Sequence, residues 1–272
     1  MILLAFNQAQ SLRRALSALE QSEGREQIEI IVLDAASTDG TSKIDAEFPA
    51  IQMLRLPHHL GAARALNIGV RTAKADLVLL LSPDVEVLPG TIVSLADGLD
   101  ADPETTAACP LLTDAAGQAT PRLYRIPAAS AVTAPLATQT PDLSEPNSLV
   151  EYPSFDALMI RKQFIAAMNY FDQRYGHYWV DAEFAMQARR ASKKIRLYPA
   201  VRAILHPAAD PLDGDSLAET DRINGAAEFA GKYGGGAFGV RMSAALSALG
   251  SFQLGKVFGV LGGQKLDGSQ AS

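Results

Sequence analysis

The N-terminal part of the chain alternates short apolar runs with amphipathic stretches, and this alternation restricts the fold more than any other feature. The apolar runs have the length of strands, and the stretches between them carry apolar residues at helical spacing. Such alternation is typical of parallel strands joined by right-handed crossovers, with helices on both faces of the sheet. The sequence therefore predicts an α/β fold with a Rossmann-like, mostly parallel sheet. The predicted strands are 2–6, 28–33, 51–56 and 77–81, and the predicted helices are 11–20, one after the turn at 37–41, and 60–74.

The chain becomes irregular between 121 and 153, where six prolines occur in 33 residues. A long irregular segment within a compact domain is usually a binding loop or lid, or it is disordered. Regular patterns return after this segment. They predict strands at 157–160, 194–198 and 201–205, helices at 161–167 and 181–192, and an aromatic stretch at 170–179.

The C-terminal part, 217–261, is mostly helical by pattern and is interrupted by the glycines 234–236. Beyond the glycines an apolar helix is predicted, and the interval between its cations Arg241 and Lys256 is too short to cross a bilayer. Two interpretations stay open for this helix. It packs against the core or a second copy of the chain, or it makes a peripheral contact with a membrane surface.

The chain is acidic, with 24 Lys and Arg against 30 Asp and Glu and a formal net charge of −6. Nucleic acid is therefore not an expected partner, because surfaces that bind it neutralise phosphates with Lys and Arg. An anionic ligand has to be held by local groups such as helix N-termini, single arginines or a bound metal ion. A single cysteine, no signal-peptide pattern and no membrane-length apolar run predict a cytoplasmic protein, peripheral to the inner face of the membrane if the C-terminal helix lies there.

Polar residues follow each predicted strand of the N-terminal part. Asn7 comes after Phe6 at the end of the first strand, Asp34 follows the second, His58 and His59 trail the third, and Ser82 and Asp84 follow the fourth. Ligands of such sheets bind beyond the carboxyl ends of the strands, so these side chains are expected to meet at one edge. The sequence therefore places a candidate ligand site at that edge.

Five segments, taken in order, resemble motifs of the family 2 glycosyltransferases of GT-A fold. The acidic and glycine-containing elements of that family are similar to DAASTDGT at 34–41, HLGAARALNIG at 59–69 and LLLSPDVE at 79–86. Its later elements are similar to WVDAEF at 179–184 and YPAVRAILH at 198–206. The resemblance covers about residues 2–207.

The resemblance implies an inverting, metal-dependent glycosyltransferase. Such an enzyme would move a sugar from a UDP- or dTDP-sugar to a hydroxyl of a glycan or lipid-linked acceptor during surface-glycan assembly. It also implies a GT-A domain at 1–210, divided into a nucleotide-binding half at 1–112 and an acceptor-binding half at 113–210. A helical extension at 211–262 and a disordered tail at 263–272 would follow.

The nucleotide is expected to contact the edge of the sheet. Asp34 is assigned to the base and ribose because a carboxylate accepts hydrogen bonds from both, although it is also a candidate turn cap. Gly61 frees the backbone near the ligand, and Arg64 is a charge-assisted donor or else a solvated helix charge. The full predicted set for the nucleotide is Phe6, Asn7, Asp34, Ser37, Gly61, Arg64, Ser82 and Asp84.

The predicted cofactor is a divalent cation, Mn²⁺ or Mg²⁺, held by Asp84. These ions prefer oxygen ligands and use one or two carboxylates with phosphates and water. His206 is a second candidate ligand whose nitrogen suits Mn²⁺ better, and its alternative role is structural. Ser82 stands where the family usually has Asp or Asn, so the site carries less charge.

Asp181 is the predicted catalytic base, since inverting transfer needs a base that reaches the acceptor hydroxyl. Its alternative role is to cap the helix that follows, in which case Glu183 becomes the next candidate base. The sugar or acceptor pocket is predicted to contain Asp156, His177, Trp179 and Glu183. Packing in the core is the alternative role for the aromatic members.

Two other classes of protein compete with an active transferase. A nucleotide-sugar-binding or scaffold protein without catalysis is suggested by Ser82 and Val180, which occupy positions that are usually acidic in the family. A dinucleotide-binding oxidoreductase needs a glycine-rich turn after the first strand, and residues 6–9 contain no glycine.

Overall fold

The structure is a computed structural model that describes residues 1–120, 122–251 and 253–268. Its strands are β1 (Ile2–Ala5), β2 (Ile31–Asp34), β3 (Gln52–Arg55), β4 (Leu77–Leu81), β5 (Val85–Val87), β6 (Thr105–Thr113), β7 (Leu123–Tyr124), β8 (Ser148–Leu149), β9 (Tyr152–Pro153), β10 (Ala157–Arg161) and β11 (Lys194–Leu205). Its α-helices are α1 (Ala9–Glu20), α2 (Gly61–Thr72), α3 (Thr91–Ala101), α4 (Lys162–Ala167), α5 (Val180–Arg190), α6 (Ser216–Gly234), α7 (Ala237–Gly250) and α8 (Leu254–Leu261). Short 3₁₀ turns, η1 (Arg25–Gln27), η2 (Gly40–Ala46) and η3 (Ala129–Ala131), lie between them.

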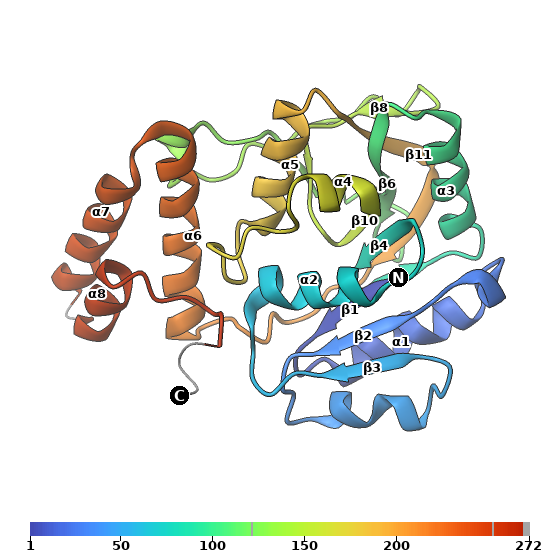
Figure 1. Ribbon diagram of the computed structural model, residues 1–272, viewed down its shortest axis with the longest axis horizontal. Coiled ribbons are helices and arrows are strands. Elements are labelled where there is room, and N and C mark those ends of the chain that lie inside the picture. The colour runs from blue at the N-terminus through green and yellow to red at the C-terminus, as the bar shows by residue number, and fades with distance from the viewer. Residues whose placement is uncertain (121, 252, 269–272) are drawn as a thin grey trace.

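Within the described residues, one nine-stranded sheet runs in the order β3-β2-β1-β4-β10-β6-β11-β5, with β8 paired to β11 (Figure 1). The strands from β3 to β4 are parallel, and Leu3 lies opposite both Val32 and Leu81. Strand β10 is antiparallel to both of its neighbours, so the second half of the sheet is mixed. The predicted α/β class and the parallel N-terminal strands are confirmed.

Both faces of the sheet are covered because β1 alternates its side chains between two hydrophobic clusters. Ile2 packs in the cluster that contains helices α2 and α5, while Leu3 packs in the cluster that contains α1 and α3. This follows from the two-residue period of a strand. Helix α1 contributes Leu12, Leu16 and Leu19 to its cluster, at the spacing that the sequence predicted.

The segment after β2 differs from the prediction, because η2 is a 3₁₀ turn and not an α-helix. The Asp39 side chain caps it and accepts the Thr41 N–H at 2.9 Å. The helical piece is only seven residues long, about two turns, and it begins with Gly40, which disfavours an α-helix.

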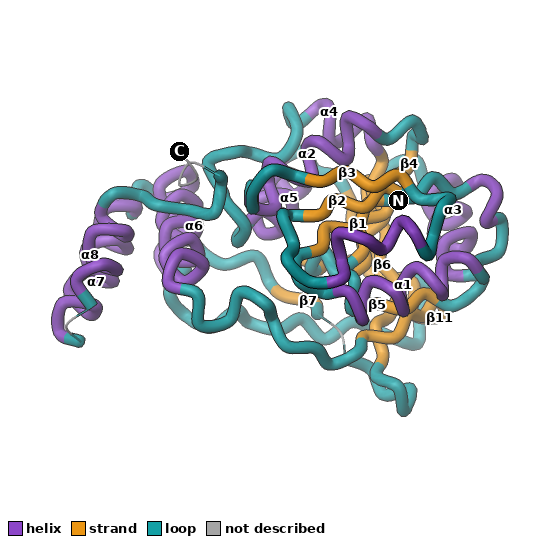
Figure 2. Tube along the Cα trace, turned by 90° about the horizontal axis from the view of Figure 1, so that it is seen from below, coloured by secondary structure: helices purple, strands orange, loops and turns teal. Residues whose placement is uncertain are grey.

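The proline-rich segment contains only short elements and runs along one side of the sheet (Figure 2). Strands β7 and β9 pair within it as a separate antiparallel sheet, with Leu123 opposite Pro153. Residue 121 lies outside the described residues. The segment is therefore irregular, as predicted, and it packs against the domain.

The C-terminal part forms α6, α7 and α8, which project from the sheet domain at one end of the molecule (Figures 1 and 2). The apolar residues after the glycines form two helices where one was predicted, with a break between Gly250 and Leu254. Within the described parts of the chain, no helix combines the length and apolarity that a membrane crossing requires.

The tail was predicted to be disordered from residue 263, and its first part is not. Leu266 and Asp267 are buried, and the Leu266 N–H donates to Asp221. The prediction missed this because a short stretch with one apolar side chain has no periodicity that would show packing. Residues 269–272 lie outside the described residues.

Candidate active site

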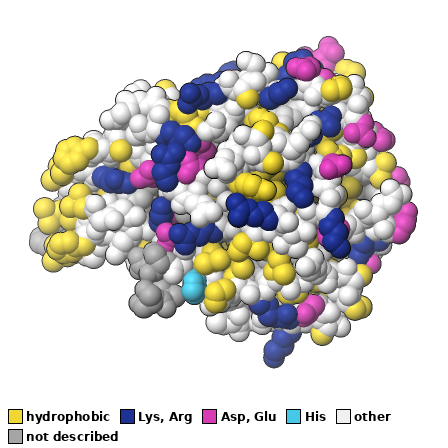
Figure 3. All heavy atoms as spheres, viewed as in Figure 1, with side chains coloured by type: hydrophobic (Ala, Val, Ile, Leu, Met, Phe, Trp, Pro, Cys, Tyr) yellow, Lys and Arg dark blue, Asp and Glu magenta, His cyan; other side chains and the backbone are white. Residues whose placement is uncertain are grey.

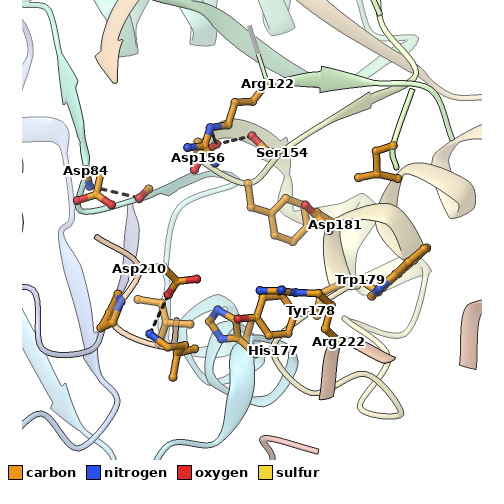
Figure 4. Close-up of a pocket in the computed structure, with 18 of the residues that line it drawn as sticks. Asp84, Arg122, Ser154, Asp156, His177, Tyr178, Trp179, Asp181, Asp210 and Arg222 are labelled. Carbon is orange, nitrogen blue, oxygen red and sulfur yellow. Dashed lines mark hydrogen bonds and ion pairs between the residues drawn. The ribbon is translucent and has the colours of Figure 1, made fainter. Parts of the chain in front are cut away.

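A cavity of about 1390 Å³ lies at the C-terminal ends of β1 and β4 and is bordered on another side by α6 and α7. This is the sheet edge at which the sequence placed the ligand site. Figure 4 shows Asp84 and Asp181 on different sides of this cavity. The predicted site residues in its lining are Phe6, Ser82, Asp84, Asp156, His177, Trp179, Asp181 and His206.

Asp84 follows β4 and has one carboxylate oxygen without a partner. Its Oδ1 atom is buried and has no hydrogen-bond partner within the described residues, while Oδ2 accepts from Gln8 Nε2 at 3.4 Å. The Asp84 backbone N–H donates to Ser82 Oγ at 3.2 Å, so Ser82 positions the turn. A buried carboxylate oxygen with no partner is a suitable ligand for a hard cation.

His206 lies beside Asp84 through its backbone only. Its N–H donates to the Asp84 carbonyl at 2.9 Å, whereas its ring Nε2 lies 2.7 Å from Glu86 Oε2 on β5. In the described part of the chain, no cluster of three or more His, Cys, Asp or Glu side chains is arranged to hold a metal ion. The predicted ligand pair of Asp84 and His206 is therefore not assembled in this structure.

Asp181 lies in the first turn of α5 and is partly exposed to the cavity. Its Oδ1 accepts the Ala182 N–H at 2.9 Å. Burial raises the pKa of its carboxyl group to about 6, although the Tyr152 hydroxyl counteracts this effect. Asp156 adds a further upward contribution through its charge. A carboxylate of this kind takes up a proton near neutral pH, as a general base must.

Asp156 forms a polar group with two neighbours on the wall of the cavity. Its Oδ2 accepts from Ser154 Oγ at 2.6 Å and lies 3.4 Å from Arg122 Nε. Figure 4 shows the three side chains together, with Arg122 coming from the proline-rich segment. This segment therefore contributes a cation to the cavity.

The aromatic segment before α5 is held in place by α6. Asp221 Oδ2 accepts the N–H groups of His177 at 2.7 Å and Tyr178 at 3.1 Å. Burial lowers the pKa of the His177 ring to about 3, so this ring is neutral at physiological pH. The Trp179 ring packs on Phe229 of α6 with centroids 5.4 Å apart, so this side chain lines the cavity and also joins the core.

Glu183 is a correction to the predicted pocket. It is buried on a different face of α5 and lines a second, smaller cavity. Its carboxylate accepts the hydroxyls of Tyr175 and Tyr233, both at 2.9 Å, and forms an ion pair with Lys232. The helical period explains this, because residues two apart on a helix point in different directions.

Asn7, Asp34 and Ser37 join the loops that follow β1 and β2. The buried Asp34 accepts the Ser37 N–H at 3.0 Å, and Ser37 Oγ accepts the Asn7 N–H at 2.9 Å. These residues lie outside the lining that the described residues form. They brace the sheet edge, which was the alternative role of Asp34, and their contact with a nucleotide stays a prediction.

Gly61 and Arg64 lie under the C-terminal segment. Gly61 has a φ of +72°, and a Cβ atom there would lie 2.0 Å from the Leu266 carbonyl oxygen. Arg64 Nη1 donates to the Asp267 carbonyl at 2.5 Å. The Arg64 guanidinium, which was predicted to bind the nucleotide, therefore contacts the C-terminal segment of the same chain.

Four residues of the site were missed by the sequence predictions. Tyr152 and Arg122 lie in the proline-rich segment, where no periodicity shows which side chains face inward. Asp221 and Arg222 lie on α6, and Arg222 lines the cavity with its guanidinium 4.5 Å from the centre of the Tyr178 ring. The helical pattern of α6 could have located the helix, but not its packing against the segment that precedes Asp181.

Comparisons of sequence identify relatives of this chain. The model of the family described as "Glycosyl transferase family 2" matches residues 1–165. An N-acetylglucosaminyl-diphospho-decaprenol L-rhamnosyltransferase of Mycobacterium tuberculosis is 25% identical over 232 residues, which are 76% of this chain and 75% of the relative. An uncharacterized glycosyltransferase of Bacillus subtilis, YfnE, is 33% identical over 88 residues, 31% of this chain and 22% of the relative.

Solved structures share the fold at low identity. GalNAc-T7 with UDP, GalNAc and Mn²⁺ has a TM-score of 0.66 at 15% identity, and the match spans 82% of this chain but only 46% of GalNAc-T7. The mannosyltransferase PcManGT of Pyrobaculum calidifontis, with GDP-Man and Mn²⁺, has a TM-score of 0.61 at 17% identity over 96% of this chain and 73% of its own. S. aureus TarS 1–349 with UDP-GlcNAc has a TM-score of 0.59 at 14% identity over 97% and 80%. The predicted GT-A fold is confirmed.

Proposed function

Because this chain belongs to glycosyl transferase family 2 and is a glycosyltransferase, we propose that it transfers a sugar from a UDP- or dTDP-sugar to a hydroxyl of a glycan or lipid-linked acceptor, with inversion. The observation that carries this proposal is the presence of Asp84 and Asp181 in one cavity. Asp84 has a carboxylate oxygen free to bind the donor side, and the raised pKa of Asp181 suits a base on the acceptor side.

The charge of the cavity supports a divalent cation as cofactor. A diphosphate brought among so many carboxylates needs positive charge to balance it. Asp84 would hold Mn²⁺ or Mg²⁺ through Oδ1, and the ion would neutralise charge on the leaving diphosphate. His206 would join only after leaving Glu86. The charged residues in the lining are the acids Asp84, Asp114, Asp156, Asp181 and Asp210 and the cations Arg122 and Arg222.

Asp181 would act on the acceptor. In the proposed step its ionised carboxylate takes the proton of the acceptor hydroxyl, and the oxygen forms a bond to the anomeric carbon of the donor sugar. The bond from that carbon to the diphosphate breaks, and the nucleoside diphosphate leaves with the electron pair. Tyr152, whose hydroxyl faces Asp181, would keep the carboxylate oriented.

Arg222, which lies on α6 in the helical extension, would stabilise the leaving nucleoside diphosphate. It lies over the Tyr178 ring, lines the cavity and forms no ion pair within the described part of the chain. A guanidinium without a carboxylate partner binds phosphate oxygens strongly through charge-assisted hydrogen bonds. Arg122 is less available because Asp156 lies 3.4 Å away.

The proposal is tested first by binding. UDP or dTDP with Mn²⁺ should raise the melting temperature, and EDTA should remove most of that gain. Asp84→Asn should lose the metal-dependent part of the gain in melting temperature. Asp97 is an exposed aspartate of α3, and Asp97→Asn should keep that gain. No shift with any nucleoside diphosphate would contradict a nucleotide-sugar site.

A panel of nucleotide sugars then separates catalysis from binding. We expect slow hydrolysis of one donor in the absence of an acceptor. The same donor should be consumed faster when a suitable glycan or lipid-linked acceptor is present. Binding without turnover of any donor would support a non-catalytic nucleotide-sugar-binding protein instead, for which Ser82 and Val180 are the sequence evidence. Val180 is buried in the hydrophobic core beside Asp181, so that position carries no acid that could replace the base.

A further inference from the structure

Helices α7 and α8 form a hairpin at the end of the molecule, beyond α6 (Figures 1 and 2). They pack against each other and α6 through small buried residues, including Ala245, Ala248 and Gly259. Six of their large apolar side chains are instead exposed to solvent. The exposed ones are Phe238, Leu246, Leu249, Leu254, Phe258 and Leu261, and we call this set the hairpin patch.

The hairpin patch is built by helical periodicity and is not a scatter of single residues. On α8, Leu254, Phe258 and Leu261 follow the i, i+4, i+7 spacing of one helix face. Phe238 is 74% exposed and Phe258 is 72% exposed, which makes them the most exposed large apolar side chains in the described part of the chain. Figure 3 shows hydrophobic side chains gathered at this end of the molecule. A contiguous apolar surface of this kind marks an interaction site.

The charge of the hairpin is compatible with an anionic partner. Residues 229–266 contain no Asp or Glu, although the whole chain carries 30. The cations Arg241 and Lys256 belong to α7 and α8 and form ion pairs with Glu228 and Glu219 on α6. These pairs balance the two cations, and the hairpin itself carries no acid that an anionic surface would repel.

The composition of the hairpin patch favours a bilayer over a protein. The large cavity, the smaller cavity beside Glu183 and a third small cavity beside Cys109 include none of its six residues in their linings. Its members are aliphatic or phenyl groups without hydrogen-bonding atoms that would specify a partner. Apolar faces of this composition insert into the headgroup region of a membrane with the helix axes in its plane.

We propose that the hairpin patch attaches this protein to the surface of a bilayer that contains anionic phospholipid, with α7 and α8 lying in the interface. Val240, Ala244 and Ser247 on another face of α7 line the large cavity, so attachment brings the cavity beside the membrane. A cavity beside the membrane gives a lipid-linked acceptor direct access to the site, and this consequence rests on the proposed function. Membrane attachment itself does not depend on sugar transfer.

The test is sedimentation of the full chain with vesicles of phosphatidylcholine and phosphatidylglycerol in equal parts. The wild-type chain should sediment with them, and Phe238→Gln/Phe258→Gln should lower its partitioning by at least about tenfold. A matched control, Leu143→Gln/Leu149→Gln, removes two exposed apolar residues from the proline-rich segment and should bind as the wild type does. Equal melting temperatures of the three proteins show that folding is intact.

A second measurement locates the contact. Tryptophan in Phe258→Trp should be quenched by brominated phospholipid, and tryptophan in Leu149→Trp should not. Failure of the wild-type chain to sediment, or equal sedimentation of the Phe238→Gln/Phe258→Gln variant, would overturn the proposal. A concentration-dependent dimer that this variant abolishes, without vesicle binding, would also overturn it and assign the patch to a second copy of the chain. Because no readout uses turnover, this proposal fails separately from the proposed function.

Discussion

The Oδ2 atom of Asp221 accepts the backbone N–H of His177 at 2.7 Å, and this bond joins helix α6 to the aromatic segment before Asp181. The same carboxylate accepts from Tyr178 and, through Oδ1, from Leu266. One buried side chain of the helical extension therefore fixes both a wall of the cavity and the C-terminal segment.

Replacing Asp221 should lower the stability of the folded protein. Asp221→Ala leaves three backbone N–H donors without their acceptor, and each buried donor left unpaired costs about 1–3 kcal/mol. We expect the free energy of unfolding to fall by about 2–4 kcal/mol after partial solvation of these groups. Urea denaturation measures this, and an unchanged midpoint would show that these hydrogen bonds contribute nothing.

Asp181→Asn should stabilise the protein above pH 6. Burial raises the pKa of Asp181 from 3.8 to about 6, so its ionised form is disfavoured in the folded state. The stability that protonated Asp181 provides is present below pH 4 and is lost as the pH rises through 6. At pH 7.5 the variant should gain about 2–3 kcal/mol over the wild type. The gain should vanish near pH 4, and a constant difference at both pH values would contradict this.

Gly61→Ala should be far more damaging than Gly117→Ala. Both glycines have positive φ, +72° and +80°, so both substitutions incur similar backbone strain. Only at Gly61 does the added Cβ meet backbone atoms, those of Leu266 and Gly176. We expect an additional loss of about 1–3 kcal/mol from this overlap and faster hydrogen exchange at the Leu266 N–H. Equal effects of the two substitutions would show that the C-terminal segment does not pack over Gly61.

Glu183→Gln should lower stability and spare catalysis in the molecules that remain folded. The substitution removes a charge that pairs with Lys232 inside a buried network. Lys232 keeps its ion pair with Asp172, so we expect the free energy of unfolding to fall by about 1–3 kcal/mol. Turnover per folded molecule should stay within about threefold of the wild type, because Glu183 lies outside the large cavity. Complete loss of turnover in a folded variant would return Glu183 to the list of candidate bases.

The sheet edge at which the site lies could be predicted from sequence because it depends on local patterns. Apolar runs fix the strands, and the residues directly after them have to lie at the sheet edge, where Phe6, Ser82 and Asp84 line the large cavity. Asp181 was singled out by its motif, and its role as a base stays a prediction. Its position in the cavity follows from helix α5, which begins at Val180.

The contacts that close the site could not be predicted because they are long-range. Asp221 lies 44 positions from His177, and Arg64 lies 203 positions from Asp267. No spacing in the sequence relates such pairs. The different roles of Asp181 and Glu183 follow from which face of α5 meets α6, and that depends on tertiary packing.

The central claim, that ionised Asp181 is the base of sugar transfer, is tested most directly by the turnover of Asp181→Asn with the donor and acceptor found in the nucleotide-sugar panel. We expect the binding of nucleoside diphosphate and Mn²⁺ to be unchanged and kcat to fall by at least about 10²–10⁴-fold. In the wild type, kcat should rise with pH through about 6, since the carboxylate must be ionised. Turnover by Asp181→Asn at the wild-type rate would contradict the account.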